Sequence, residues 1–422
     1  MIHHTHAVRC HVLFEAKTGL LIRSGREGTF TDSAIECDPE GRLHINGYVW
    51  ASLLRRAVDR LVGGELLAKS WGKMPQEEMR VSPLWTEASF IAKQNYEPVV
   101  NPGIRINREW GVTDEGALYN DEMAIPIAPI SCRFTLFCAS KEVAEAMKGR
   151  IADLLWVIGQ GIETVGGGWA YGFGRLQPLS AHLAVLDLQI ETGRLSLWQP
   201  SFNNWETPFD KDALAERRPQ IAPEKGWRCL EVAAGVADGQ LLAIHATIPP
   251  LTGELPADMP DRFVFARPRI NSPTMTAVPV LTGKAFRQAV LSREIERILR
   301  TTGEGACLNT SEEKRTPVIP IAGSKEGCHC KRCLWFGDTH QAGIVSVGDT
   351  EIDEPRYETI HRIALCEHSM QNINLFSFEY LTRGRFNLRI LIDHPRGKDA
   401  DAKIGKDCEE AIAALLNGMM RD

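Results

Sequence analysis

The sequence lacks any apolar run of membrane-spanning length, and its first residues have neither the basic region nor the apolar core of a signal peptide. We therefore expect a cytoplasmic protein with no membrane segment. A strong excess of either charge is also missing, since the net charge is −6 over 422 residues. This balance argues against a protein that coats nucleic acid indiscriminately, but it is compatible with a local basic groove.

The cysteine count is odd, and without a secretory signal the eleven cysteines favour reduced thiols over a disulfide framework. Seven are scattered, and four form a separate group with the spacing C-x-C-x-x-C in its second part. Four thiolates brought together in this way can close a tetrahedral, structural zinc site. Reduced thiols without metal are the alternative, and His329 or His340 could replace one ligand. The four cysteines are Cys307, Cys328, Cys330 and Cys333.

Glycine is concentrated in one stretch, Val165–Arg175, where five glycines fall within nine residues. Each glycine costs conformational entropy and contributes no side chain, so these residues do not suit a packed core. We expect a loop that lets a backbone or a phosphate approach closely, with free N–H groups pointing outward. A flexible turn that carries aromatic residues is the alternative.

Hydrophobic periodicity predicts an α+β fold with two tandem ferredoxin-like (RRM-like) modules. In the first module, residues 1–185, a strand at Ala7–Ala16 precedes a helix, an arm, a strand at Arg133–Ala139 and a helix capped by Ser140. Residues 186–227 are a connector. Residues 228–422 repeat the order of elements but end on a helix, without a Gly-rich loop or a closing strand.

Two aspartates stand in equivalent places of the two predicted modules. Asp32 lies in the polar segment before the first helix, and Asp261 lies in the polar segment before the second. A turn or cap role is the ordinary interpretation of such residues. The functional hypothesis is that each carboxylate lies beside an RNA phosphodiester, where it orients or deprotonates the 2′-hydroxyl or holds a hard cation.

Together these segments resemble the backbone RAMP proteins of type III CRISPR effector complexes. The Gly-rich stretch is that superfamily's signature. In the second module the cysteine knuckle precedes Leu334–Gly337, but the arm His361–Leu365 lacks the Glu-Gly-Ala-Leu pattern of the first arm. Two fused units in one chain are similar to the multi-module III-D or III-E systems. The other matching segments are Thr31–Ser33, Asp38–Gly41, Ile45–Gly47, Gly103–Arg108 and Glu115–Tyr119.

The resemblance implies a guide-RNA (crRNA)-binding subunit that cleaves complementary target RNA as a metal-dependent endoribonuclease, with other CRISPR effector subunits as partners. Asp32 and Asp261 would be catalytic with Mg²⁺ or Mn²⁺, and Zn²⁺ would be structural. A competing alignment puts Asn271 at the second position, which would make that module silent. The absent second Gly-rich loop implies a trimmed chain, or a neighbouring subunit that completes the fold.

Guide binding is expected from cations and backbone N–H groups, with sequence read by base pairing. A solvated surface charge is the alternative for each cation, and core packing is the alternative for each aromatic residue. The candidates are Arg55, Arg56, Arg105, Arg108, Gly166, Gly167, Gly168, Trp169, Tyr171, Gly172, Arg175, Lys284, Arg287 and Arg362.

Three other functions remain open on the sequence. A non-catalytic RNA-binding scaffold would carry inert aspartates. A guide-processing RAMP endoribonuclease usually relies on a histidine base, and the first polar segment, Ser24–Ser33, contains no histidine. A regulatory nucleic-acid-binding protein would use the zinc knuckle, but it would need only one compact module.

Overall fold

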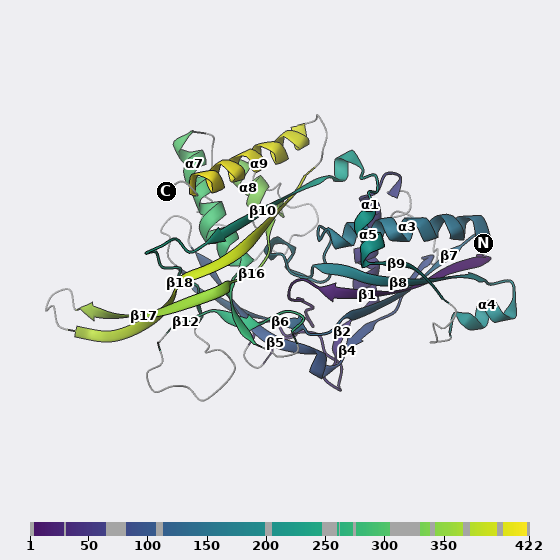
Figure 1. Cartoon of the computed structure of the whole chain (residues 1–422), viewed down its shortest axis with the longest axis horizontal. Coiled ribbons are helices and arrows are strands. Elements are labelled where there is room, and N and C mark those ends of the chain that lie inside the picture. Colours follow the sequence, from purple (N-terminus) through teal and green to yellow (C-terminus); the bar gives the residue numbers. More distant parts are fainter. Residues whose placement is uncertain are drawn as a thin grey trace.

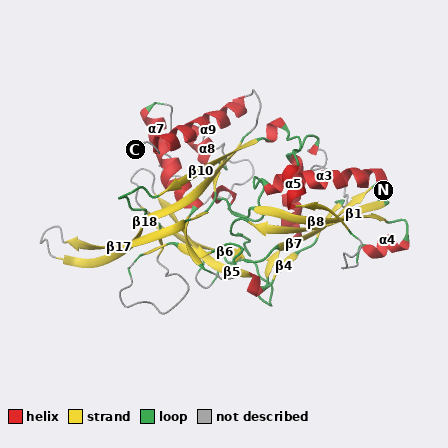
Figure 2. Cartoon of the chain, in the orientation of Figure 1, coloured by secondary structure: helices red, strands yellow, loops and turns green. Residues whose placement is uncertain are grey.

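The computed structural model is a mixed α/β structure with several antiparallel sheets (Figures 1 and 2). Among the described residues, no helix is both long and apolar enough to cross a lipid bilayer. The structure describes residues 4–28, 31–64, 82–106, 113–198, 205–246, 260, 262–272, 276–303, 330–337, 342–365, 372–394 and 400–419.

The N-terminal half is built on a five-stranded antiparallel sheet with helices above it in Figure 1. Its strand order is β3-β7-β1-β8-β9, with α1 between β1 and β3 and α3 between β7 and β8. The part β8-β1-β7-β3 therefore has the β–α–β–β–α–β plan of a ferredoxin-like fold. The elements are β1 (His6–Ala16), α1 (Gly47–Asp59), β3 (Leu84–Thr86), β7 (Ile130–Cys138), α3 (Lys141–Gly159), β8 (Leu176–Asp187) and β9 (Glu206–Asp210).

Local sequence explains these elements. Alternate residues of β1, such as Cys10 and Phe14, are fully buried beneath the helices, and the Phe14 ring stacks on Trp50 of α1 at 5.7 Å. Helix α3 begins at the predicted cap, because the Ser140 hydroxyl accepts the Val143 N–H. The strands predicted at Ala7–Ala16 and Arg133–Ala139 and this helix are confirmed.

The C-terminal half contains a second antiparallel sheet in the order β10-β18-β15, with β17 also paired to β18. A continuous helical run, α6–η4–α7, connects β14 to the segment before α8, and α9 follows β18. The elements are β10 (Trp227–Gly235), β14 (Ala277–Leu281), α6 (Gly283–Ala285), η4 (Phe286–Ser292), α7 (Arg293–Thr301), α8 (Lys331–Phe336), β15 (Val345–Val347), β17 (Asp353–Leu365), β18 (Asn372–Asp393) and α9 (Ala400–Met419).

Each half carries a long two-stranded arm. The first arm pairs β5 (Tyr96–Ile106) with β6 (Thr113–Pro126), and the second pairs β17 with β18. The second arm projects from the left of the molecule in Figure 1. The sequence located both arms, at Gly103–Tyr119 and at His361–Leu365, but both are longer in the structure.

The remaining elements are short. They are β2 (Leu43–Ile45), β4 (Ser89–Ile91), η1 (Lys93–Asn95), η2 (Trp169–Tyr171), α4 (Glu191–Ser196), α5 (Lys211–Glu216), η3 (Pro223–Lys225), β11 (His245–Ala246), β12 (Phe263–Val264), β13 (Ala266–Pro268) and β16 (Thr350–Glu351).

The Gly-rich loop is a joint between the two halves. Gly172 has a φ of +71°, and a Cβ added there would lie 2.3 Å from the Cα of Gly348. Beside it, the Ser346 hydroxyl donates to the Trp169 carbonyl oxygen at 2.5 Å. Only glycine combines this backbone conformation with so close an approach.

The expectation that this loop points free N–H groups outward is wrong for most of its amides. The Gly167 N–H donates to the Leu21 carbonyl at 2.9 Å, and the Gly174 N–H donates to the Gly19 carbonyl at 2.9 Å. Other loop amides bond to carbonyls of the loop itself. The glycines therefore serve close packing inside the protein.

Charged and polar contacts reinforce the joint. Arg60 of α1 donates from both terminal nitrogens to the Asp393 carboxylate of β18, at 2.6 and 2.9 Å. Burial opposes the charge of Arg60, but its ion pairs with Asp393 and Glu163 raise the pKa of Arg60 above its usual range. Asn271, in a left-handed conformation, donates from Nδ2 to the Ala16 carbonyl at 2.7 Å.

Substituting Gly172 tests the joint. We expect Gly172→Ala to lower the free energy of unfolding by about 1 to 3 kcal/mol, because the new Cβ overpacks Gly348 at a positive φ. Urea unfolding followed by tryptophan fluorescence measures the change. The matched control is Gly149→Ala in α3, where nothing lies within 4 Å of an added Cβ, and which should be neutral or stabilising. Equal free energies of unfolding for the two variants would contradict the role of Gly172 in close packing between the halves.

Candidate functional site

Asp32 lies where the segment after β1 meets the base of the first arm. Its N–H donates to the Asn120 carbonyl at 2.8 Å, and the Asn120 N–H donates to its Oδ2 at 2.6 Å. Ser33 then forms a parallel bridge with Asp121 of β6. These contacts fix the carboxylate against the arm, while Asp32 itself stays exposed.

The Asp32 carboxylate is oriented by a hydrogen bond to one of its two oxygens. No described residue donates a hydrogen bond to its Oδ1. An exposed carboxylate held through one oxygen can accept a proton from a hydroxyl, or can bind a hydrated Mg²⁺ together with a substrate phosphate. The residues present therefore fit a hard cation, with Asp32 as its protein ligand.

The arm strand that holds Asp32 also carries Tyr119 and Asp121, on either side of Asn120. These two residues belong to a group of charged and aromatic side chains that we call the seam cluster: Arg23, Tyr119, Asp121, Tyr171 and Lys284. Arg23 Nη2 donates to both Asp121 carboxylate oxygens at 3.1 Å. Lys284 reaches in from α6, and its Nζ lies 4.0 Å from the Tyr119 ring centroid and 5.6 Å from that of Tyr171. The cluster therefore combines residues of both halves.

Burial shapes the protonation of this cluster. It lowers the pKa of Lys284 to about 8, a shift that the Asp121 carboxylate opposes and Arg23 increases. Burial also raises the pKa of Tyr119 to about 12, with Tyr171 and Asp121 adding to the effect. Lys284 is therefore a cation at neutral pH whose charge is incompletely solvated, a condition that favours binding of an anion such as a phosphate.

The backbone contacts around Asp32 recur in the C-terminal half. Ser33 bridges Asp121 in parallel, and the next arm residue, Glu122, accepts the Ile35 N–H at 3.0 Å. In the other half, Arg262 bridges Phe378 in parallel, and the next arm residue, Glu379, accepts the Val264 N–H at 3.0 Å. Three residues further along each arm, Ala124 and Leu381 form antiparallel bridges with Leu20 and Leu242.

Residues 13–177 match the family model of the RAMP superfamily. The matched part is less than half of the chain, and we refer to it below as the RAMP domain. It spans the Asp32 segment, the first arm and the Gly-rich loop. No curated protein matches the sequence.

The second predicted catalytic residue, Asp261, lies outside the described residues. Its neighbour Arg262 makes the parallel bridge that corresponds to Ser33 of the RAMP domain. The competing residue, Asn271, lies instead at the joint, where its N–H donates to the Pro126 carbonyl at 3.2 Å and its side chain donates to Ala16. Asn271 therefore forms hydrogen bonds that join the two halves.

Several residues predicted to contact RNA instead form hydrogen bonds with other parts of the protein. Arg287 is 3 % exposed and donates to the Val345 and Phe336 carbonyls, at 2.9 and 2.8 Å. Arg56 donates to Glu163, Ser52 and the Thr164 carbonyl at 2.6 to 2.7 Å. Hydrogen bonding of this kind gives both arginines a structural role and leaves Arg287 no surface for RNA.

Residues of the Gly-rich loop of the RAMP domain are likewise engaged in contacts inside the protein. Burial and the nearby Arg389 lower the pKa of Arg175 to about 10. Trp169 donates from its indole nitrogen to the Ile162 carbonyl at 3.0 Å. Gly166 and Gly168 have positive φ and pack against Leu21 and Phe173. Of the loop residues, Tyr171 alone belongs to the seam cluster. Arg55 has its Nε buried beneath the surface of α1.

Other predicted contacts lie on the arms. Arg362 is exposed on β17, and its guanidinium lies 5.7 Å from the Phe378 ring and 5.8 Å from the Tyr380 ring. The side chains of Arg105 and Arg108 lie outside the described residues.

A groove of about 1050 Å³ at the base of the second arm carries charges of both signs. Arg383 and Arg385 each lie 3.9 Å from the Glu354 carboxylate. The other charged lining residues are Arg356, Asp238 and Asp353.

The predicted zinc knuckle is described only in part, since Cys307 and Cys328 lie outside the described residues. Cys330 is the N-cap of α8, and Cys333 is fully buried in its first turn. Within the described ranges, no group of three or more His, Cys, Asp or Glu side chains gathers around a common point. A C-x-x-C pair at a helix start fits half of a four-thiolate site.

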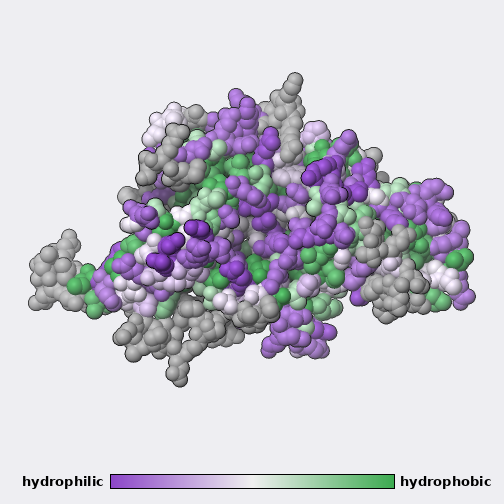
Figure 3. All heavy atoms as spheres, in the orientation of Figure 1, coloured by the Kyte–Doolittle hydropathy of each residue, from purple (hydrophilic) through white to green (hydrophobic). Residues whose placement is uncertain are grey.

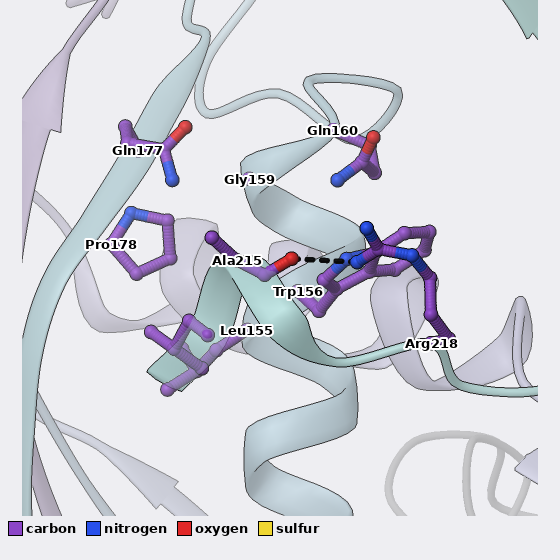
Figure 4. Close-up of a pocket in the computed structure, with 9 residues that line it drawn as sticks. Leu155, Trp156, Gly159, Gln160, Gln177, Pro178, Ala215 and Arg218 are labelled. Carbon is purple, nitrogen blue, oxygen red and sulfur yellow. Dashed lines mark hydrogen bonds between the residues drawn. The ribbon is translucent and has the colours of Figure 1, made fainter. Parts of the chain in front are cut away.

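A separate hollow of about 450 Å³ lies between α3, β8 and α5 (Figure 4). Trp156, Gln160, Gln177 and Arg218 line it, and Arg218 donates to the Ala215 carbonyl at 2.6 Å. It contains none of the predicted site residues. The seam cluster and Asp32 therefore remain the main candidate site of the RAMP domain.

The sequence reading missed most of the seam cluster. Arg23 and Asp121 are separated by almost a hundred residues, and neither belongs to a motif. It also missed His11 and His182, whose rings stack 6.2 Å apart across β1 and β8. Their positions on adjacent strands follow from register, which no local pattern reveals.

Lys284 should make stability depend on alkaline pH. Its folded-state pKa of about 8 lies below the ordinary 10.5, so holding its charge costs stability at low pH. That cost is present in full below about pH 8, and it disappears as the pH rises from about 8 towards 10.5. Relative to Lys284→Met, the wild type should gain stability across this window, as measured by denaturant unfolding at each pH. The matched control is Lys403→Met at an exposed position of α9, and a pH-independent difference for Lys284→Met would contradict the assignment.

Proposed function

We propose that this protein is a crRNA-binding backbone subunit of a type III CRISPR effector, built from two tandem RAMP modules, and that it cleaves target RNA at Asp32 and Asp261. The RAMP family match supports the first module. The second module is supported by the sheet order β10-β18-β15, which repeats the order β1-β7-β3 of the first.

The single observation that carries the proposal is the repeated contact between an aspartate-bearing segment and the base of an arm. In each half, the residue after the aspartate bridges the arm in parallel, and a glutamate one position further accepts a backbone N–H. A repeated scaffold of this kind, with Asp at the same step, supports a paired function for Asp32 and Asp261.

The chemistry proposed for Asp32 is in-line attack of a ribose 2′-hydroxyl on the adjacent phosphodiester. The O2′–P bond forms as the P–O5′ bond breaks, which leaves a 2′,3′-cyclic phosphate and a 5′-oxygen that takes a proton from water. The carboxylate orients the hydroxyl or accepts its proton, while the seam cluster supplies the Lys284 and Arg23 cations near the phosphate. A bound Mg²⁺ or Mn²⁺ would stabilise the negative charge of the transition state. Asp32 and, in the second module, Asp261 would hold it.

RNA cleavage by the assembled guide complex tests the proposal. We expect Asp32→Ala and Asp261→Ala each to remove one specific product, with the corresponding rate falling by about 10² to 10⁴-fold. Chelation should stop both cuts, and target binding should persist, because pairing with the guide supplies the affinity. The measurement is a gel assay of end-labelled target RNA in magnesium and in chelator.

The matched control is Asp238→Ala, at an exposed aspartate in the turn after β10, which should leave both products intact. Loss of a product with Asp32→Ala alone would make the second module a scaffold. Unchanged products in both variants and in the double variant would make the whole protein a non-catalytic guide-binding backbone.

We further propose that Cys307, Cys328, Cys330 and Cys333 hold one structural zinc ion. The support is the spacing of the four thiols and the location of the last pair at the start of α8, a helix whose Trp335 and Phe336 are buried in the core. Such a site would tie the segment before α8 to that core.

Metal analysis checks the zinc proposal. The purified chain should contain about one zinc per molecule, and Cys307→Ser or Cys328→Ser should release it. Mass spectrometry under native conditions and a colorimetric thiol-release assay measure this. The control is Cys37→Ser, at an exposed cysteine of the first half, which should keep the zinc. Full zinc content in both knuckle variants would contradict the ligand set.

A further inference from the structure

The hollow between α3, β8 and α5 shares no residue with the seam cluster. Its volume is about 450 Å³, which falls within the range of roughly 300 to 1,000 Å³ that is typical of small-molecule sites. Leu155, Pro178 and Leu214 form its apolar wall. Sites of this kind combine an apolar lining with a few polar groups that orient the ligand, so we asked which polar groups face this hollow.

Two glutamine side chains line the hollow. Gln160 is the C-cap of α3, and Gln177 lies near the start of β8. Both residues are half-buried, and neither side-chain amide has a hydrogen-bond partner among the described residues. Figure 4 shows them on opposite sides of the hollow. Because an amide carries a donor and an acceptor side by side, these two groups suit the edge of a nucleobase.

Trp156 supplies a fixed aromatic wall. Its ring packs on that of Trp227, with 6.3 Å between the ring centroids and 46° between the ring planes. Trp227 is buried, whereas Trp156 is only partly buried and lines the hollow. The contact with Trp227 therefore holds the indole in place, and the indole offers the ligand a surface on which a planar ring can stack.

Arg218 brings a cation to the same hollow. Its Nη1 donates to the carbonyls of Ala215 and Arg217, both at 2.6 Å. Its Nε and Nη2 have no partner in the part of the chain that the structure describes, and the side chain is exposed. Figure 3 shows mainly hydrophilic side chains at the surface over α5. A guanidinium with two free donors in such surroundings suits a phosphate group.

Gly159, the last residue of α3, leaves room for the Gln177 amide. Its φ lies outside the left-handed region, so the backbone does not require glycine there. Glycine in a helix costs about 1 kcal/mol relative to alanine. A Cβ added at this position would lie 3.3 Å from Gln177 Nε2 and 3.3 Å from Pro178 Cδ. The missing side chain therefore keeps the amide in its place beside the hollow.

We propose that this hollow binds an adenine nucleotide, either free or as one nucleotide of an RNA strand. Adenine presents a donor and an acceptor side by side at N6 and N7, and a glutamine amide bonds to both at once. The ring stacks on Trp156, and the phosphate binds the free donors of Arg218. The hollow contains none of the residues proposed for cleavage, so this inference does not rest on the proposed function.

Equilibrium dialysis of labelled AMP against the full chain tests the proposal. We expect saturable binding of about one AMP per chain. GMP and UMP should bind at least about tenfold more weakly, because neither presents the paired donor and acceptor of adenine N6 and N7. Gln177→Leu should weaken AMP binding by about tenfold or more for the same reason. The matched control is Gln189→Leu, at an exposed glutamine just after β8, which should bind AMP as the wild type does.

A second variant separates the phosphate from the base. Arg218→Met should weaken AMP binding by about tenfold but leave the binding of adenosine unchanged, because adenosine has no phosphate. Gln177→Leu should instead weaken both ligands. Arg218 is exposed, so its loss should not disturb folding. Asp32→Ala should leave AMP binding unchanged, which keeps this test separate from any cleavage assay.

Competition with single-stranded RNA distinguishes the two sources of the nucleotide. Displacement of labelled AMP by an adenine pentamer at a lower concentration than unlabelled AMP requires would assign the hollow to RNA, and displacement by unlabelled AMP alone would assign it to a free nucleotide. A uridine pentamer is the control. The proposal is wrong if AMP and UMP bind equally, or if Gln177→Leu leaves the binding of both AMP and the adenine pentamer unchanged.

Discussion

The contact of the Gly-rich loop with the second half holds the rest of the architecture in place. Gly172 approaches Gly348 so closely that no side chain fits between them. Around this contact, Arg60 pairs with Asp393, and Asn271 reaches the end of β1. Because interiors are close-packed and transmit strain, this joint determines where α6 stands relative to the first arm. The joint thereby places the Lys284 ammonium group over the Tyr119 ring.

The second constraint is the register between each polar segment and its arm. The arm bonds to this segment at its two ends. Leu20 exchanges backbone hydrogen bonds with Ala124, and the carboxylate of Asp32 accepts from the backbone of Asn120. The cleavage proposed for Asp32 would need this rigidity, since a carboxylate on a loose loop does not keep its geometry towards a phosphodiester. The pattern recurs at Arg262, where the side chain of Glu379 accepts a backbone N–H as that of Glu122 does in the first half.

Charge in this protein is local. The chain has a net charge of −6, yet two cations, Arg23 and Lys284, lie together at the seam cluster. Several other arginines, Arg287 among them, donate hydrogen bonds to backbone carbonyl oxygens inside the fold. Total charge therefore says little about where an RNA backbone would lie, because binding follows the exposed cations alone.

The sequence by itself determined the local elements, because periodicity and capping act over a few residues. The alternation in β1 and the Ser140 cap of α3 were readable in advance, and the Asp32 segment with the Gly-rich loop was enough to point to the RAMP superfamily. Tertiary structure alone decided that the loop glycines allow close packing between the two halves, and which cations stay exposed. It also brought Arg23, Tyr119 and Lys284 together, since contacts between distant segments depend on packing and strand register, which no short pattern encodes.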